Sequence, residues 1–272
     1  MTSRNASVTD HTMALRVLYF LSFLAFSYAG IVPFFNPRIV NGQDAKEGEI
    51  PYQVSLQDKN NSDHFCGGVI LNENYVITTA HSVETKQAKD VIVVAGTIDL
   101  NNPKSLHNVE EIIIHENYDA NDSWINDIAL LKVTPPFENS TTIKPIELRL
   151  TNVENYDPAV VSGWGRLWQT GPSTNKLQRV DIFIADHSYC ERQYQERFRM
   201  TVYQNEQVCA FNPSSDKGSC QGDSGGPLTI NNELVGLVSW AYGCADQIYP
   251  TVFTRVLTYK NWIESKINPP IF

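Results

Sequence analysis

The chain has 272 residues, of which 42% are hydrophobic and 19% are charged. This balance is typical of a globular protein and excludes a long disordered or collagen-like chain, while the length allows one large domain or two modest ones. The formal net charge of −9 disfavours nucleic acid as the main partner, because an acidic surface repels phosphate.

The first predicted element is an uncharged, apolar run over residues 17–32. Arg4 and Arg16 precede the run. The small residues Ser27 and Ala29 occupy the −3 and −1 positions of a cleavage site after Ala29. This layout predicts a secretory signal peptide over residues 1–29. Secretion would leave the mature chain extracellular, where disulfides are permitted.

A membrane anchor is the alternative interpretation of this run. It is disfavoured because a span needs about 20 apolar residues and Pro33 interrupts any extension. We therefore expect no membrane association after processing. Translation starts at Met1 or at Met13, since the segment from Met13 also makes a compact signal.

The rest of the chain alternates short apolar runs with turn residues and shows no helical period between them, which predicts an all-β fold. At the end, Val256, Tyr259, Ile263 and Ile267 recur at helical spacing, which predicts a short C-terminal helix over 256–267. The predicted strands are 52–56, 68–71, 75–79, 91–95, 112–114, 128–133, 159–161, 180–184, 234–240 and 252–256.

Three segments carry candidate catalytic residues. Ser224 lies in the sequence GDSGGP, where glycines let the backbone turn tightly and bring N–H groups towards one point. His81 ends an apolar strand and Asp127 begins another. Taken singly, the serine motif could be an ordinary loop, the histidine a structural residue and the aspartate a turn residue. Together, in the order His, Asp, Ser, they match one of the few known orders of a serine hydrolase triad.

Through these motifs the chain resembles the trypsin/chymotrypsin family of serine proteases, from Ile39 to Trp262. The resemblance implies an all-β fold of two antiparallel six-stranded β-barrels, with the active site in the cleft between them. It places the protease domain at 39–272, with barrel one at about 39–148 and barrel two at about 149–255. The further matching segments are 39–42 (IVNG), 51–56 (PYQVSL), 65–68 (FCGG), 162–165 (SGWG) and 238–240 (VSW).

The resemblance also implies the catalytic roles. Ser224 would be the nucleophile, His81 the general base and then acid, and Asp127 the residue that orients the histidine. The backbone N–H groups of Gly222 and Ser224 would form the oxyanion hole. The expected activity is a serine endopeptidase that works through an acyl-enzyme and needs no cofactor.

Activation is implied in the same way. Cleavage of Arg38–Ile39 would remove a propeptide of residues 30–38 and free the α-amino group of Ile39. In the family that ammonium pairs with the acid before the nucleophile, here Asp223. The partners expected are protein or peptide substrates, an activating trypsin-like protease and protein protease inhibitors, with the enzyme itself a monomer.

The substrate pocket departs from that of trypsin. The position at the pocket floor, which is aspartate in trypsin-like enzymes, is Gly218 here. The Lys or Arg side chain of a substrate would therefore be buried without a carboxylate to pair with. Ala241 and Thr251 stand where glycines are usual and narrow the walls, which predicts elastase-like cleavage after small to medium apolar residues. The first alternative is chymotrypsin-like cleavage after aromatic or large apolar residues. The second alternative is a non-catalytic homologue that acts as a binding protein. The implied substrate-binding residues are Gly218, Ser219, Ser239, Trp240, Ala241 and Thr251.

The five cysteines depart from the family. The resemblance implies the disulfides Cys190–Cys209 and Cys220–Cys244. Cys66 matches half of a third pair, but Ser82 stands at its partner's position, so a free thiol at Cys66 is expected. A buried, inert thiol is the favoured interpretation, and a reactive thiol near the cleft is the other.

Surface features carry less weight. Asn60, Asn121 and Asn139 fit the N-glycosylation acceptor and are expected on surface loops. No metal site is expected, because residues 97–100 have few carboxylates where some relatives bind calcium.

Overall fold

A computed structural model describes residues 40–268 of the chain. They belong to a compact unit that spans Pro37–Phe272, while a second unit, Met1–Asn36, lies outside the described residues. The predicted signal peptide, the propeptide, Arg38 and Ile39 also fall outside them. None of the described helices has the length and apolar character needed to cross a membrane.

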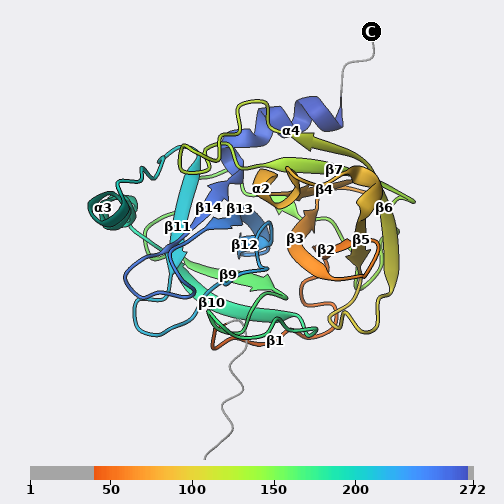
Figure 1. Ribbon diagram of the computed structural model, residues 1–272, viewed down its shortest axis with the longest axis horizontal. Coiled ribbons are helices and arrows are strands. Elements are labelled where there is room, and N and C mark those ends of the chain that lie inside the picture. The colour runs from red at the N-terminus through yellow and green to blue at the C-terminus, as the bar shows by residue number, and fades with distance from the viewer. Residues whose placement is uncertain (1–39, 269–272) are drawn as a thin grey trace, which may run out of the picture. The chain divides into compact units, whose positions relative to one another are not determined.

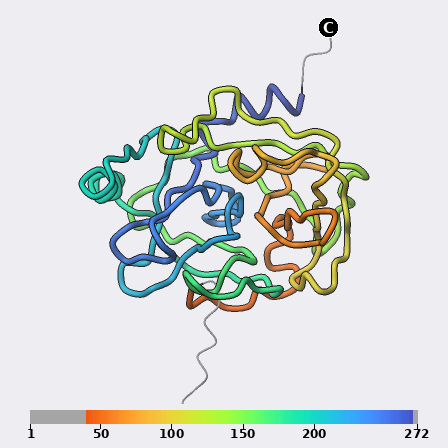
Figure 2. The backbone as a smooth tube through the Cα atoms, in the orientation of Figure 1, coloured from red at the N-terminus to blue at the C-terminus, as the bar shows by residue number. Residues whose placement is uncertain are grey.

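The first half of the described chain forms a closed antiparallel barrel (Figure 1, right; Figure 2). Its strand order is β2-β3-β4-β7-β6-β5, and β2 pairs with β5 to close it. Side chains of the barrel interior are mostly Val, Ile and Leu, the residues that pack best on a pleated surface. The strands are β2 (Gln53–Asp58), β3 (His64–Ile70), β4 (Tyr75–Thr78), β5 (Val91–Ala95), β6 (Ser105–Ile114) and β7 (Ala129–Thr134).

The second half forms another closed barrel, in the order β10-β11-β14-β13-β12-β9, with β9 pairing back to β10 (Figure 1, left). Two six-stranded barrels are thus confirmed, as is the short C-terminal helix, which is α4 (Lys260–Ile267) preceded by a 3₁₀ turn, η3 (Val256–Tyr259). The strands are β9 (Pro158–Gly163), β10 (Gln178–Ile184), β11 (Gln207–Phe211), β12 (Pro227–Ile230), β13 (Glu233–Trp240) and β14 (Thr251–Arg255).

Two short strands depart from the expected division at residue 148. Strand β1 (Gln43–Asp44) pairs antiparallel with β10, and β8 (Glu147–Leu148) pairs parallel with β13. Both strands flank barrel one in sequence, yet both extend the sheet of barrel two. A hydrogen bond of 2.6 Å from Gln178 Nε2 to Asp44 Oδ1 holds the first of them in place.

One helix lies among the strands of barrel two, where the sequence pattern did not indicate it. α3 (His187–Phe198) lies between β10 and β11. Only Cys190 and Tyr194 are buried along it, so it lacks the apolar stripe by which a helix is recognised. Its N-terminus is capped by Asp186, whose carboxylate accepts from the N–H of Tyr189 at 2.8 Å.

One of the buried apolar clusters joins the two barrels. It includes Tyr52 and Ile77 of the first half and Trp164 and Leu237 of the second, each less than a tenth exposed. A buried amide, Gln53 Nε2, also donates to the carbonyl of Ser162 at 2.9 Å. The barrels are therefore fixed against each other by apolar burial and by hydrogen bonds, which gives residues from both a defined relative position.

Candidate active site

His81 and Asp127 are brought together by the pairing of two strands of barrel one. β4 pairs with β7 so that Thr78 lies opposite Ala129. His81 follows three residues after Thr78, in the short helix α2 (Ala80–Val83), and Asp127 precedes Ala129 by two. The register of a buried sheet therefore sets the distance between the two side chains.

The carboxylate of Asp127 is 1% exposed and accepts three hydrogen bonds. Oδ1 accepts from the backbone N–H of His81 at 2.9 Å, and Oδ2 accepts from Nδ1 of the same residue at 2.7 Å. The hydroxyl of Ser239 donates to Oδ2 as well, at 2.5 Å. With Nδ1 donating to the carboxylate, the other ring nitrogen, Nε2, is the one free to accept a proton.

Two opposing effects set the basicity of His81. Burial lowers the pKa of the imidazole, but the hydrogen bond and the negative charge of Asp127 outweigh it, so the pKa is raised above its usual value. The protonated form of His81 is thereby stabilised, which is the property expected of a general base.

Ser224 lies in a turn that packs against the end of β4. The Ser224 carbonyl accepts from the N–H of Gly67 at 2.7 Å, and the Gly225 N–H donates to Val238 at 2.8 Å. Gly225 has a φ of +74°, and a Cβ there would come 2.1 Å from Oγ1 of Thr78. Only glycine permits this approach, which holds the serine turn beside the strand that precedes His81.

The turn before the serine is also held by barrel one. Gly222 has a φ of +96°, and its carbonyl lies 2.9 Å from Nε2 of His64. Nδ1 of His64 lies 2.8 Å from the hydroxyl of Ser55. Burial lowers the pKa of His64 to about 4, more than the bond to Gly222 raises it. The ring is therefore neutral at pH 7, with one nitrogen donating to the Gly222 carbonyl.

Asp223 is fully buried between the two glycines of the SGWG segment. Its carboxylate accepts from the N–H groups of Gly165 at 2.8 Å and Cys220 at 2.9 Å. Added Cβ atoms would come 2.0 Å from it at Gly163 and 2.6 Å at Gly165, so both glycines make room for the acid. Burial raises its pKa to about 7, although these two bonds oppose the shift. Within residues 40–268, no cation is close enough to offset the burial.

A cavity of about 230 Å³ opens beside Ser224. None of the described residues that line it carries a charge. The lining comes from the serine segment, from β13 and the residues after it, from the start of β14 and from one loop of barrel one. The lining residues are Trp124, Ser219, Cys220, Gln221, Ser224, Val238, Ser239, Trp240, Ala241, Gly243 and Thr251.

Two hydroxyls of the cavity lining contact each other. Oγ of Ser219 and Oγ1 of Thr251 are 3.1 Å apart, and both residues are buried. They come from different segments, so their contact joins two walls. Gly218 is not among the lining residues, and a Cβ there would lie 3.2 Å from the Cα of Ala245.

Comparison with known proteins identifies the family. Residues 39–263 match the family model Trypsin. The chain is 38% identical to chymotrypsin-2 of Vespa crabro over 83% of this chain and 98% of that one. It is 37% identical to trypsin epsilon of Drosophila erecta and 39% identical to a trypsin of Sarcophaga bullata, each over 92% of this chain and 97% of the relative.

The chain belongs to the trypsin family of serine proteases. It is therefore a serine endopeptidase, a hydrolase whose substrates are proteins. Ser224 lines the cavity, and Ser239, which also lines it, is hydrogen-bonded to the carboxylate of Asp127 that contacts His81.

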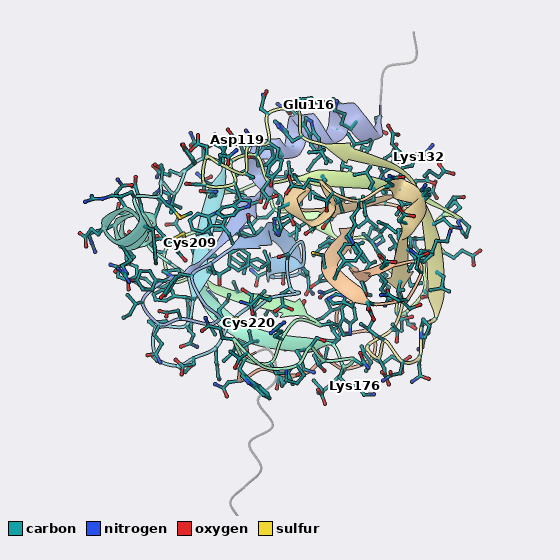
Figure 3. The ribbon with its side chains drawn as sticks, viewed as in Figure 1. Glu116, Asp119, Lys132, Lys176, Cys209 and Cys220 are labelled. Atoms are coloured by element: carbon teal, nitrogen blue, oxygen red, sulfur yellow. A yellow bond between two sulfur atoms is a disulfide. The ribbon has the colours of Figure 1, made fainter. Side chains whose placement is uncertain are left out.

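The protease has disulfides between Cys190 and Cys209 and between Cys220 and Cys244 (Figure 3 labels Cys209 and Cys220). The second bond ties the serine segment to the loop after β13. Cys66 is free and buried. Burial raises its pKa to about 11, against a hydrogen bond from Ser82 that lowers it. The thiol is thus protonated at neutral pH, as the inert interpretation requires.

Trp124 lines the cavity, yet sequence reasoning did not single it out. It lies three residues before Asp127, in a loop whose pattern gives no sign of a binding role. The sequon residues Asn60, Asn121 and Asn139 are all exposed. Among the described residues, no group of three or more His, Cys, Asp or Glu side chains could hold a metal ion.

Proposed function

We propose that this protein is a secreted serine endopeptidase, made as a zymogen, that cuts after small to medium apolar residues. The observation that carries the specificity is the contact of 3.1 Å between the hydroxyls of Ser219 and Thr251. Both residues line an uncharged cavity next to the proposed nucleophile, and we infer that their contact limits the size of the side chain it accepts.

The reaction would proceed in two halves. Oγ of Ser224 attacks the scissile carbonyl carbon while Nε2 of His81 takes the hydroxyl proton. The C–N bond then breaks, His81 gives that proton to the leaving amine, and an acyl-enzyme remains. Water attacks the ester with His81 as base again, and the peptide acid leaves as Ser224 regains its proton.

The charges formed along this path need partners. Asp127 stabilises the imidazolium of His81 and holds its ring in place. The N–H groups of Gly222 and Ser224 would hold the oxyanion, each donor contributing about 3 kcal/mol to the transition state.

Labelling with a serine-directed fluorophosphonate tests this mechanism. We expect modification at Ser224 in chain cleaved after Arg38, and no modification of the matched Ser224→Ala variant. Cleaved chain whose Ser224 stays unlabelled would be a non-catalytic homologue that acts by binding.

Zymogen activation is proposed from the burial of Asp223. A fully buried carboxylate with a pKa near 7 is stabilised by a cation, and the α-ammonium of Ile39 supplies one after cleavage. Full-length chain should be inert and should gain activity when trypsin cuts Arg38–Ile39. An Arg38→Gln variant should stay inert under the same treatment; activation of that variant would contradict the proposed site.

The proposed specificity makes self-activation unfavourable. A pocket without a carboxylate does not offset the desolvation of an arginine, so cleavage after Arg38 is assigned to a separate trypsin-like protease. We expect a monomeric enzyme that protein protease inhibitors block.

Peptide substrates that differ only in the residue before the scissile bond test the pocket. Ala, Val and Leu should give the highest kcat/KM, with Phe lower and Arg lowest. Thr251→Gly removes the hydroxyl contact and should raise the Phe-to-Ala ratio by about tenfold. Fastest cleavage after Arg in the unaltered enzyme would refute the assignment.

Cleavage after aromatic residues is the second candidate. The cavity of about 230 Å³ and the similarity to a chymotrypsin favour it. A higher kcat/KM for Phe than for Leu in the unaltered enzyme would select this alternative.

A further inference from the structure

A cavity of about 320 Å³ opens in barrel two, apart from the substrate cavity. The two cavities have no described lining residue in common. The cavity is bounded by the end of β10, the start of α3, part of β11 and the last residue of β14. Figure 3 labels Cys209 of β11, which lies in its wall. A volume of this size is enough for a small-molecule ligand.

Arg255 is the one permanently charged side chain among the described residues that line this cavity. Its Nη1 donates to the carbonyl of Gln204 at 2.9 Å, and its Nη2 donates to Oδ1 of Asn152 at 2.7 Å. Both acceptors are neutral. A guanidinium has five N–H groups, so these two bonds leave three for another acceptor.

Two other arginines within residues 40–268 are half-buried, and each is paired with an acid. Arg149 and Arg179 each contact a glutamate carboxylate, at 3.0 and 2.9 Å. Arg255 is half-buried too, but it forms no ion pair with any residue that the structure describes. A partly buried cation without a counter-ion is costly, so an anion bound in this cavity would gain free energy from Arg255.

Uncharged amides surround the guanidinium. In the described part of the chain, the side-chain amides of Gln204 and Asn205 form no hydrogen bond, and Nδ2 of Asn152 forms none either. Amides both donate and accept hydrogen bonds, as the hydroxyl groups of a sugar require. The buried apolar residues Ile184 and Val208 also line the cavity, and they can cover the C–H groups of a ligand.

His187 lines the same cavity. Burial lowers the pKa of its imidazole, and the charge of Arg255 lowers it further, while the charges of Glu191 and Asp186 oppose the shift. The carboxylate of Asp186 caps α3. No acidic side chain is among the described lining residues, so the charge that faces a ligand is positive.

We propose that this cavity is a binding site for a sugar that carries a sulfate or phosphate group. The guanidinium of Arg255 holds the oxyanion with paired N–H groups, the arrangement that arginine offers to tetrahedral anions. The amides of Gln204 and Asn205 bind hydroxyl groups of the sugar. Because the site is separate from the substrate cavity, the protein can hold an anionic sugar while the substrate cavity stays open.

Calorimetric titration of the Ser224→Ala chain tests this site. The probes are glucose 6-sulfate, glucose 6-phosphate, glucose and inorganic sulfate, all at one ionic strength. We expect one or both esters to bind, inorganic sulfate to bind at least tenfold more weakly, and glucose not to bind measurably. The tighter ester identifies the group that the site takes.

Two results of this titration would contradict the proposal. The absence of binding by either ester at about 10 mM would overturn the site. Equal affinities for inorganic sulfate and glucose 6-sulfate would mean an adventitious ion only and would overturn the assignment of a sugar.

Variants locate the binding. Arg255→Gln should weaken the ester at least tenfold, because a neutral amide replaces a charge-assisted hydrogen bond. Arg149→Gln is the matched control, since Arg149 is a half-buried arginine outside the cavity, and it should leave the affinity unchanged. Gln204→Ala removes only an exposed side chain and should weaken the ester several-fold. Unchanged affinity in both Arg255→Gln and Gln204→Ala would overturn the site.

Titration of the histidine rings by NMR gives a second measure of position. Bound glucose 6-sulfate should raise the pKa of His187, because a nearby anion stabilises the imidazolium. The pKa of His115, a half-buried ring outside the cavity, should not change. Equal shifts of both rings would indicate a general effect of the added salt and would contradict binding beside His187.

Discussion

The hydroxyl of Ser239 and the ring of His81 donate to the same oxygen of Asp127, Oδ2. Ser239 also lines the substrate cavity. One carboxylate oxygen therefore links the histidine of barrel one to the substrate wall of barrel two.

Replacing Asp127 with asparagine should abolish most of the activity. The amide keeps the shape but can offer its N–H₂ to Nδ1 of His81, which selects the tautomer that cannot accept a proton from the nucleophile. We expect kcat to fall about ten-thousand-fold, the loss that the same exchange causes in a well-studied member of the family. Ser239→Ala, which keeps the carboxylate, should cost about tenfold. Equal losses in the two variants would contradict this role.

The pH profile should report the same contact. Protonated His81 cannot act as a base, so kcat/KM should fall on acidification through its pKa. Asp127 raises that pKa, so removing the charge in Asp127→Asn should move the acidic limb to lower pH. Initial rates from pH 4 to 9 measure the acidic limb of both enzymes. An unchanged midpoint in the variant would show that Asp127 does not set the pKa of His81.

Stability should depend on pH through His64. Its folded pKa is about 4, below the unfolded value of about 6.5, so the unfolded chain binds more protons between these values. The free energy of unfolding should therefore decrease as the pH falls from 6.5 to 4. His64→Gln, which keeps a polar side chain, should flatten this slope in urea titrations of the Ser224→Ala enzyme. A slope as steep as in the parent would assign the effect to other groups.

A cysteine at position 82 should restore a disulfide. The hydroxyl of Ser82 lies near enough to the thiol of Cys66 to lower its pKa, against the larger effect of burial. In Ser82→Cys, closing a loop of ~15 residues should raise the free energy of unfolding by about 3 kcal/mol. Thermal unfolding with and without reductant measures the gain, and Ser82→Ala is the control.

Thiol titration supplies the second readout for this variant. The single thiol of the parent should react only after unfolding, because it is buried with a raised pKa. Ser82→Cys should show none even when unfolded, and two titratable thiols would mean that no bond forms.

The parts of the fold that the sequence could predict are those with a strong local pattern. Val91–Ala95 is an apolar run and appears as β5 with the same bounds, and the spacing of Tyr259 and Ile263 marked the C-terminal helix. α3 was missed because only two of its side chains are buried, which leaves no clear apolar stripe in the sequence. Strand β11 was missed too, since Gln207–Phe211 has one β-branched residue, Val208, where Val91–Ala95 has four.

The candidate site divides in a similar way. Residues inside dense motifs, such as Ser224 and His81, could be singled out before any coordinates. Trp124 could not, because its place in the cavity wall depends on a left-handed backbone, with a φ of +52°, and on the ring of Trp240 that stacks on it from the other barrel. Such contacts form between segments far apart in the chain and leave no local trace.

The pairing of β1 and β8 with barrel two has a consequence for folding. The two short strands bracket barrel one, so that barrel is in effect an insertion whose ends are both fastened to its neighbour's sheet. Completing that sheet requires pairing of Asp44 with Gln178, a contact of very long sequence separation, which slows folding. A fragment that starts after Leu148 would lose both outer strands at once. We therefore expect the two barrels to fold as one cooperative unit. Separately produced barrels should not assemble when they are mixed.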